Sequence, residues 1–130
     1  MAIVVHHTAT PPYTTWQTIA EYHVNTNGWS GIGYHTGVDA DGNISLLGDL
    51  DSQRAHVAKR NHELVSISLI GNFTDGEPPL LQQHGLLDAI AWLRAVYGDI
   101  PVLGHREAAL LSDPTSCPGN ALFAILNQFR

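Results

Sequence analysis

The chain contains three short apolar runs with the pattern of buried β-strands, at residues 3–8, 64–70 and 101–104. The run at 64–70 overlays polar–apolar alternation on a nearly continuous apolar segment, which is typical of a strand covered on both faces. We therefore place it at the centre of a sheet. Two further strands, 32–38 and 43–47, flank a turn whose Gly42 suits a β-hairpin.

Helical periodicity fills the segments between these runs. Thr14 or Thr15 can cap a helix that extends to about Val24, residues 81–97 predict the longest helix, and 120–129 predict a closing one. The longest helix carries one apolar stripe, at Leu86, Ile90, Leu93 and Tyr97. The strand that follows it is expected to run parallel to a neighbour. The order of elements predicts a single α/β domain with a central mixed sheet flanked by helices.

Composition narrows the classes of function. The 130 residues include 12 acidic and 6 basic side chains, for a net charge of −6, which argues against binding nucleic acid through basic residues. No apolar stretch approaches the roughly 20 residues that span a bilayer. Met1 leads directly into a strand-like run, without the basic start of a signal peptide. We expect a monomer made in the cytoplasm, with no membrane insertion and no nucleic-acid partner.

Two histidine-bearing segments and the single cysteine carry the candidate chemistry. His6 and His7 lie near the end of the first apolar run, His105 follows the last one, and Cys117 comes twelve residues later. Strand ends meet at the edge of a sheet, so these groups can converge. Two imidazoles and one thiolate form a three-ligand zinc set with an open position, as in catalytic zinc sites. Neighbouring side chains of a strand face opposite sides, so His6 and His7 cannot both be ligands.

Five short motifs occur in a fixed order along the chain: Val-His-His-Thr-Ala-Thr at 5–10, Trp-Ser-Gly-Ile-Gly-Tyr-His at 29–35, Ala-His at 55–56 with Asn61, Gly-His-Arg-Glu at 104–107 and Thr-Ser-Cys-Pro-Gly at 115–119. This order resembles the type 2 N-acetylmuramoyl-L-alanine amidases, which include phage endolysins and peptidoglycan recognition proteins. The resemblance implies that residues 1–130 form a zinc amidase catalytic domain. Its substrate would be peptidoglycan or a muropeptide, cut between N-acetylmuramic acid and L-alanine. It also implies a phage or prophage endolysin that acts on the cell wall after release.

The resemblance assigns the zinc ligands by position, to His6, His105 and Cys117. His7 is then a packed neighbour. It assigns Tyr34 as a hydrogen-bond donor in catalysis, together with Thr115, where relatives carry lysine or threonine.

Substrate contact is expected at His56, on the rim of the groove, and at Trp29, which can form a wall against a sugar. Glu107 lies near His105 in sequence and is a candidate proton donor, but pairing with Arg106 or orientation of a ligand competes with that role. The other histidines are assigned no specific role: His35 is expected to pack on the face opposite Tyr34, and His23, His62 and His84 are expected on helical or loop surfaces.

Two other functions remain open. One is a non-catalytic peptidoglycan-binding module, which typically lacks the cysteine ligand. The other is an amidase that recycles soluble muropeptides, a class that resembles an aspartate-ligand pattern where this chain has Cys117. A glycosidase needs two carboxylates that flank the sugar bond, and no such pair stands out in the sequence.

Overall fold

The computed structural model describes every residue from Met1 to Arg130 and contains one five-stranded sheet. The strands are β1 (Ala2–His7), β2 (Thr36–Val38), β3 (Ile44–Leu46), β4 (Leu64–Leu69) and β5 (Val102–Gly104), in the spatial order β3-β2-β4-β1-β5. All neighbouring pairs are parallel except the β2–β3 hairpin. The predicted mixed sheet, with β4 at its centre, is confirmed.

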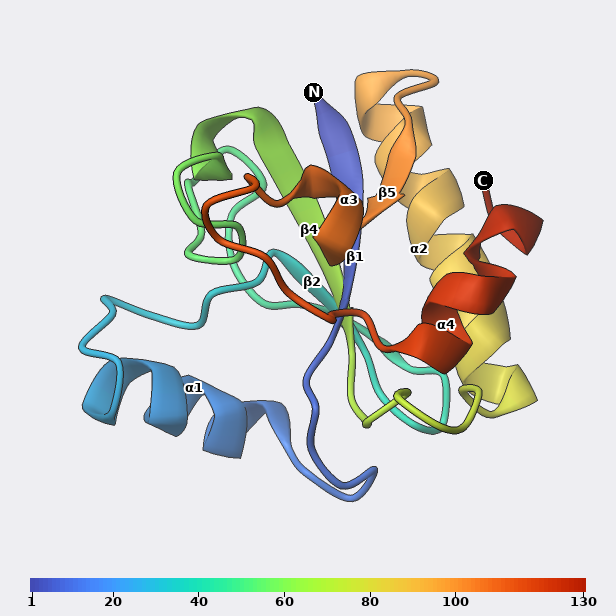
Figure 1. Ribbon diagram of the computed structural model, residues 1–130, viewed down its shortest axis with the longest axis horizontal. Coiled ribbons are helices and arrows are strands. Elements are labelled where there is room, and N and C mark those ends of the chain that lie inside the picture. The colour runs from blue at the N-terminus through green and yellow to red at the C-terminus, as the bar shows by residue number, and fades with distance from the viewer.

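The helices are α1 (Trp16–Asn25), α2 (Leu80–Tyr97), α3 (His105–Ala108) and α4 (Asn120–Ile125), with short 3₁₀ helices η1 (Asn61–Glu63) and η2 (Leu126–Gln128). Thr15 caps α1, because its hydroxyl accepts from the backbone N–H of Thr18. In Figure 1, α2 and α4 lie together to the right of the strands, and α1 lies apart from them at the lower left. None of the helices has the length and apolar character needed to cross a membrane.

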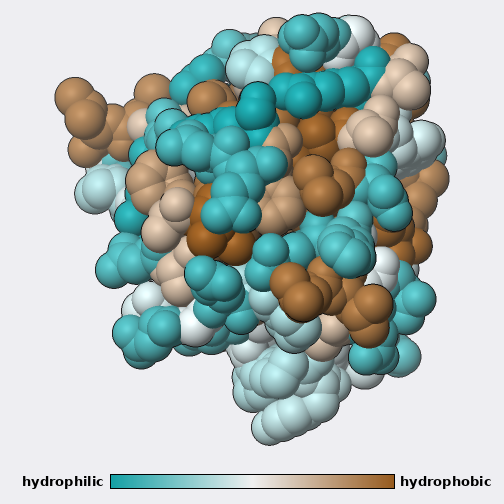
Figure 2. Space-filling view, turned by 90° about the vertical axis from the view of Figure 1, so that its right-hand side faces the viewer, coloured by the Kyte–Doolittle hydropathy of each residue, from teal (hydrophilic) through white to brown (hydrophobic).

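One face of the sheet forms the main apolar core. Alternate side chains of β1 and β4, including Ile3, Val5 and Ile67, pack here against α2 and α4. The helices contribute Leu86, Leu93 and Leu122. The predicted stripe of α2 is confirmed, since Leu86, Ile90 and Leu93 are buried and Tyr97 packs at the edge of the core. Figure 2 shows the outer side of this layer, where hydrophobic residues form patches that hydrophilic residues interrupt.

The other face of the sheet is mostly polar near the ends of β1 and β4. His6, Ser66 and Ser68 are buried there, and His35 lies against the same layer. A small apolar cluster fills the rest of this face: Ala2, Val4, Val57, Leu64 and Ala108. Because successive side chains of β1 point to opposite faces of the sheet, one face carries the apolar core and the other carries the buried polar layer.

Two local features differ from the prediction. Strand β2 begins at Thr36 instead of residue 32, because backbone N–H groups before it are used elsewhere: Gly33 donates to His23 Nδ1 at 2.9 Å and His35 donates to Ser66 Oγ at 2.8 Å. The short helix α3 was not predicted. It begins directly at the end of β5, where the Glu107 side chain accepts from the N–H of Gly104 at 2.8 Å.

Candidate metal centre

His6 is held by β1, which pairs with a neighbouring strand on each of its edges. β1 pairs with β4 along its whole length and with β5 at its centre, and His6 lies opposite Ser68. The imidazole is 1% exposed and its ring centroid lies 4.6 Å from that of His105. His7 is positioned by a different contact, since its Nδ1 accepts from the N–H of Phe73 at 3.1 Å.

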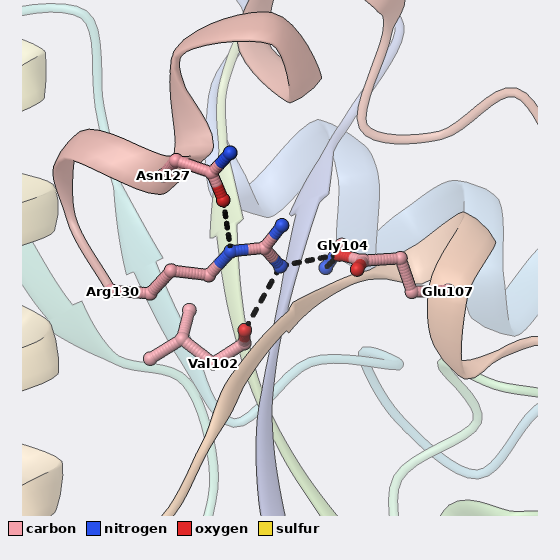
Figure 3. A network of polar contacts seen from close by, with 5 residues as sticks. All are labelled: Val102, Gly104, Glu107, Asn127 and Arg130. Carbon is pink, nitrogen blue, oxygen red and sulfur yellow. Dashed lines mark hydrogen bonds and ion pairs between the residues drawn. The ribbon is translucent and has the colours of Figure 1, made fainter.

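His105 is the first residue of α3 and is oriented by a network around Glu107 (Figure 3). One carboxylate oxygen of Glu107 accepts from the N–H of Gly104 and, at 2.6 Å, from Arg130. Arg130 also donates to the carbonyl of Val102 at 3.2 Å and to Asn127 at 2.8 Å. The network thus fixes the sharp change from strand to helix that presents His105.

The loop that carries Cys117 is tied to α3 by Arg106. The backbone N–H of Arg106 donates to the carbonyl of Cys117 at 2.9 Å, and its guanidinium donates to the carbonyl of Ser116 and to Asn120. The same guanidinium lies over the Phe123 ring, 4.6 Å from its centroid. Arg106 directly follows His105 in the chain, and it binds the backbone of Ser116 and Cys117. These contacts therefore fix the position of Cys117 relative to His105.

His6, His105 and Cys117 form a cluster that can bind a metal ion. Each offers one ligand atom, and these atoms lie within 4.8 Å of one another. His6 Nδ1 lies 3.8 Å from Cys117 Sγ. Tetrahedral zinc holds an imidazole nitrogen and a thiolate sulfur about 3.6 Å apart, judged from its ordinary bond lengths. The spacing of His6 and Cys117 therefore fits zinc, and the His105 ligand atom lies within 4.8 Å of both.

Burial sets the protonation of these donors in the metal-free chain. It lowers the pKa of His105 to about 4 and the pKa of His6 well below its ordinary value, with neighbouring histidines adding to both shifts. Both rings are neutral near pH 7 and can offer a lone pair. Burial raises the pKa of the Cys117 thiol to about 12. A bound cation would have to displace that proton, as is usual for thiolate ligands.

Tyr34 and Thr115 lie beside the cluster. The Tyr34 ring is 5.3 Å from that of His6, between centroids. Burial, with a contribution from Cys117, raises the pKa of Tyr34 to about 12 against the opposing effect of the Ser68 hydroxyl, so the phenol stays protonated. Thr115 Oγ1 accepts from the N–H of Cys117 at 3.1 Å, which leaves the hydroxyl hydrogen available to another partner.

Two adjoining cavities open around these groups. One, of about 330 Å³, is lined by the three cluster residues together with His7, Ala9, Trp29, Tyr34, Ala55, His56, Thr115 and Ser116. The other, of about 370 Å³, shares Ala9 and Tyr34 and extends past Thr14 and then along α1 past Thr18 and Tyr22. Trp29 is half-buried against the His23 ring, with 4.6 Å between centroids. The cluster therefore lies in the wall of a groove large enough for an extended ligand.

The sequence did not predict several buried contacts around the cluster. His23 is buried, not on a surface as expected, because its Nδ1 accepts from the N–H of Gly33. His35 is clamped between Ser66 and the carbonyl of Ser52, which its Nε2 approaches at 2.7 Å. Glu107 pairs with Arg130 instead of Arg106. These partners lie 10 to 31 residues apart in the chain, and local sequence carries no signal for such pairings.

Comparison with known proteins identifies the chain. The model of a protein family described as N-acetylmuramoyl-L-alanine amidase matches residues 1–120. The chain belongs to this amidase family. It is 31% identical to the N-acetylmuramoyl-L-alanine amidase of Mus musculus over 98% of its own length, but it spans only 26% of that protein.

Two solved structures have the same fold as this amidase-family chain. The endolysin of the Thermus scotoductus bacteriophage Ph2119 is 27% identical with a TM-score of 0.87, over 98% of this chain and 82% of the endolysin. A mutant of Drosophila PGRP-LB, solved in complex with tracheal cytotoxin, is 28% identical with a TM-score of 0.84, over 98% of this chain and 80% of that one. The predicted family and fold are therefore confirmed.

The first prediction concerns Glu107, whose hydrogen bonds to Gly104 and Arg130 indicate a structural role and not a catalytic one. Burial raises its pKa, but hydrogen bonds from Arg130 and Gly104 outweigh this and hold the pKa below its ordinary value, so the carboxylate is a poor proton donor at pH 7. Glu107→Gln should lower the free energy of unfolding by about 1 to 2 kcal/mol and leave turnover of the metal-loaded chain within a few-fold. Chemical denaturation and turnover measure the two effects. A hundredfold loss of turnover without loss of stability would instead indicate a proton donor.

The buried histidines give a second prediction. Six have pKa values lowered mainly by burial: His6, His7, His23, His35, His56 and His105. The unfolded chain protonates them near pH 6.5, whereas the folded chain resists protonation down to about pH 4 at His105 and about pH 3 at His56. Between these values the unfolded state binds more protons, so stability falls as pH falls. The melting temperature of the chelator-treated chain should drop steadily from pH 6.5 to pH 4.5.

The matched control for this pH dependence is His84→Gln. His84 is exposed in the folded chain, so its removal should leave the profile unchanged. A melting temperature that stays constant between pH 7 and pH 5 would show that the buried rings are not held neutral.

Proposed function

We propose that this chain is a zinc-dependent amidase that hydrolyses the bond between N-acetylmuramic acid and L-alanine in bacterial peptidoglycan. The observation that carries the proposal is a complete His6–His105–Cys117 donor set in the wall of a groove, in a chain of the amidase family. We further propose that residues 1–130 act as one catalytic domain. The similarity to a phage endolysin supports action on the cell wall.

The donor set supports zinc over other metals. Two neutral imidazoles and a thiolate are the borderline-soft ligands that zinc prefers, whereas magnesium and calcium prefer oxygen. When bound, zinc supplies a Lewis acid that polarises an amide carbonyl and activates water. His6, His105 and Cys117 hold the ion, and their buried surroundings limit competing contact with solvent.

Tyr34 and Thr115 act as neutral hydrogen-bond donors to the carbonyl oxygen of the scissile amide. Tyr34 stays protonated because burial raises its pKa to about 12, and Thr115 has its hydroxyl hydrogen to give. Donors fixed in place before reaction stabilise the negative charge that develops on that oxygen. Threonine brings no positive charge, so the cation must supply most of that stabilisation.

The muropeptide lies along the two adjoining cavities. Together they provide room for a sugar near Trp29 and for a peptide along α1. Trp29 offers an aromatic face, and His56 lies in the wall of the same cavity. The complex of the Drosophila relative with tracheal cytotoxin supports a groove that binds muropeptides. The complete donor set favours hydrolysis over binding alone.

Metal content gives the third prediction. The purified chain should hold about one zinc ion, and Cys117→Ser should lower zinc affinity and abolish hydrolysis, because an alcohol is a far weaker zinc ligand than a thiolate. The measurement is elemental analysis after dialysis against a weak chelator. His7→Asn is the control: asparagine keeps an acceptor for the N–H of Phe73, and this variant should retain zinc. Full metal and full activity in Cys117→Ser would overturn the ligand assignment.

Product analysis tests the proposed function directly and gives the fourth prediction. Digestion of purified peptidoglycan should release new L-alanine amino termini and no new reducing sugar ends, because amide hydrolysis leaves glycosidic bonds intact. Amino-terminal labelling and a reducing-end assay measure the two products. Reducing ends without new amino termini would refute the amidase proposal.

Tyr34→Phe is the matched variant for this digestion. It removes one hydroxyl and leaves all three donor side chains in place. Turnover should fall roughly 100- to 1,000-fold while zinc content and muropeptide affinity change little, as for the loss of other oxyanion donors. Turnover near that of the unmodified chain would assign Tyr34 to packing alone.

A further inference from the structure

The side chain of His56 is hydrogen-bonded to the candidate ligand His6. His56 Nδ1 lies 3.0 Å from His6 Nε2. The two rings meet edge to face, with 5.1 Å between centroids and an interplanar angle of 75°. His56 is only 5% exposed, so this contact is shielded from water.

The two ring nitrogens of His6 have different surroundings. Nδ1 faces Cys117 Sγ at 3.8 Å, and Nε2 faces His56. A neutral imidazole carries one hydrogen, and the nitrogen that binds a cation must not carry it. Metal binding at Nδ1 therefore leaves the hydrogen on Nε2, which donates it to Nδ1 of His56.

The position of His56 is fixed from two sides. Asn61 Oδ1 accepts from the backbone N–H groups of His56 at 3.0 Å and Val57 at 2.7 Å. The His35 ring packs edge-on against His56, with 5.4 Å between centroids, and His35 is itself held by Ser66. These contacts hold the His56 acceptor against His6.

Packing alone does not explain a histidine at this position. His56 Nε2 is buried, and the backbone carbonyl of Leu64 opposes the lowering of the His56 pKa by burial, which is the effect of an acceptor that faces a ring N–H. With its hydrogen on Nε2, the ring leaves Nδ1 as a lone-pair acceptor for His6, which an apolar side chain could not provide. Its low exposure and its engaged Nδ1 also leave little of the ring to contact a substrate.

We propose that His56 is a positioning residue that accepts the Nε2 hydrogen of His6, and so holds His6 in the tautomer and orientation that present Nδ1 to a metal ion. The inference rests on the proposed zinc site. Partners of this kind orient ligating histidines and raise their basicity, and their loss typically weakens metal binding roughly 10- to 100-fold.

The test compares two substitutions with opposite properties. His56→Phe keeps the ring volume and removes the acceptor, whereas His56→Asn loses volume but keeps an oxygen near the position of Nδ1. Zinc affinity, measured by competition with a chromogenic chelator, should fall roughly 10- to 100-fold in the phenylalanine variant and stay within a few-fold of the unmodified chain in the asparagine variant. The visible absorption spectrum of the cobalt-loaded chain should change only in the phenylalanine variant.

The opposite order would overturn the inference. If His56 serves packing, phenylalanine preserves zinc affinity and asparagine lowers it. If His56 instead contacts substrate, both variants bind zinc normally and raise KM. His56→Leu, which also lacks an acceptor, replaces the phenylalanine variant should that one not fold. Absence of zinc binding by the unmodified chain would refute the proposed function as well, whereas equal zinc affinity in the unmodified and phenylalanine chains would refute only the role of His56.

Discussion

The parallel pairing of β1 between β4 and β5 is the constraint on which the rest of the site depends. The register is set on both sides, with Val5 opposite both Ile67 and Gly104. A shift of one residue would turn His6 into the apolar core and expose Val5 to the polar layer. Because the core face packs against α2 and α4, such a shift would bury polar groups without partners. The apolar core therefore fixes the orientation of His6 from the opposite face of the sheet.

Much of the fold follows from the sequence because its signals are local or periodic. The apolar run around Ile67 predicts the central strand, and Gly98 at the end of α2 and Thr15 at the start of α1 mark helix boundaries. The candidate ligands could also be recognised, because Cys117 is unique and His105 follows an apolar run. The choice between His6 and His7 could not be made from alternation alone, which gives two faces but does not say which one carries the site. The resemblance to a family supplied that choice.

The surroundings of the ligands could not be predicted in the same way. The partners of Glu107 and His6 are Arg130 and His56, which lie 23 and 50 residues away in the chain. Their pairing is a result of packing, and no propensity or short motif encodes it. The same holds for residues 32–35, where the strand pattern is present but side chains of His23 and Ser66 take the backbone N–H groups that a ladder would need. Hydrogen bonds to these distant side chains therefore replace the strand pairing that the local pattern predicts.

The polar layer also explains how the candidate ligand cluster can be buried within a stable fold. Each imidazole on this face is neutral and most are hydrogen-bonded, so the layer can be buried without unpaired charge. The sheet and the hydrogen-bonded loops hold the candidate ligand atoms within 4.8 Å of one another. Binding of a cation would still require removal of one proton from Cys117, whose thiol is held neutral by the same burial. Burial therefore orders the histidines and keeps the Cys117 thiol protonated, and the proposed zinc ion is consistent with this, because a thiolate binds thiophilic ions more tightly than it binds oxygen-seeking metals.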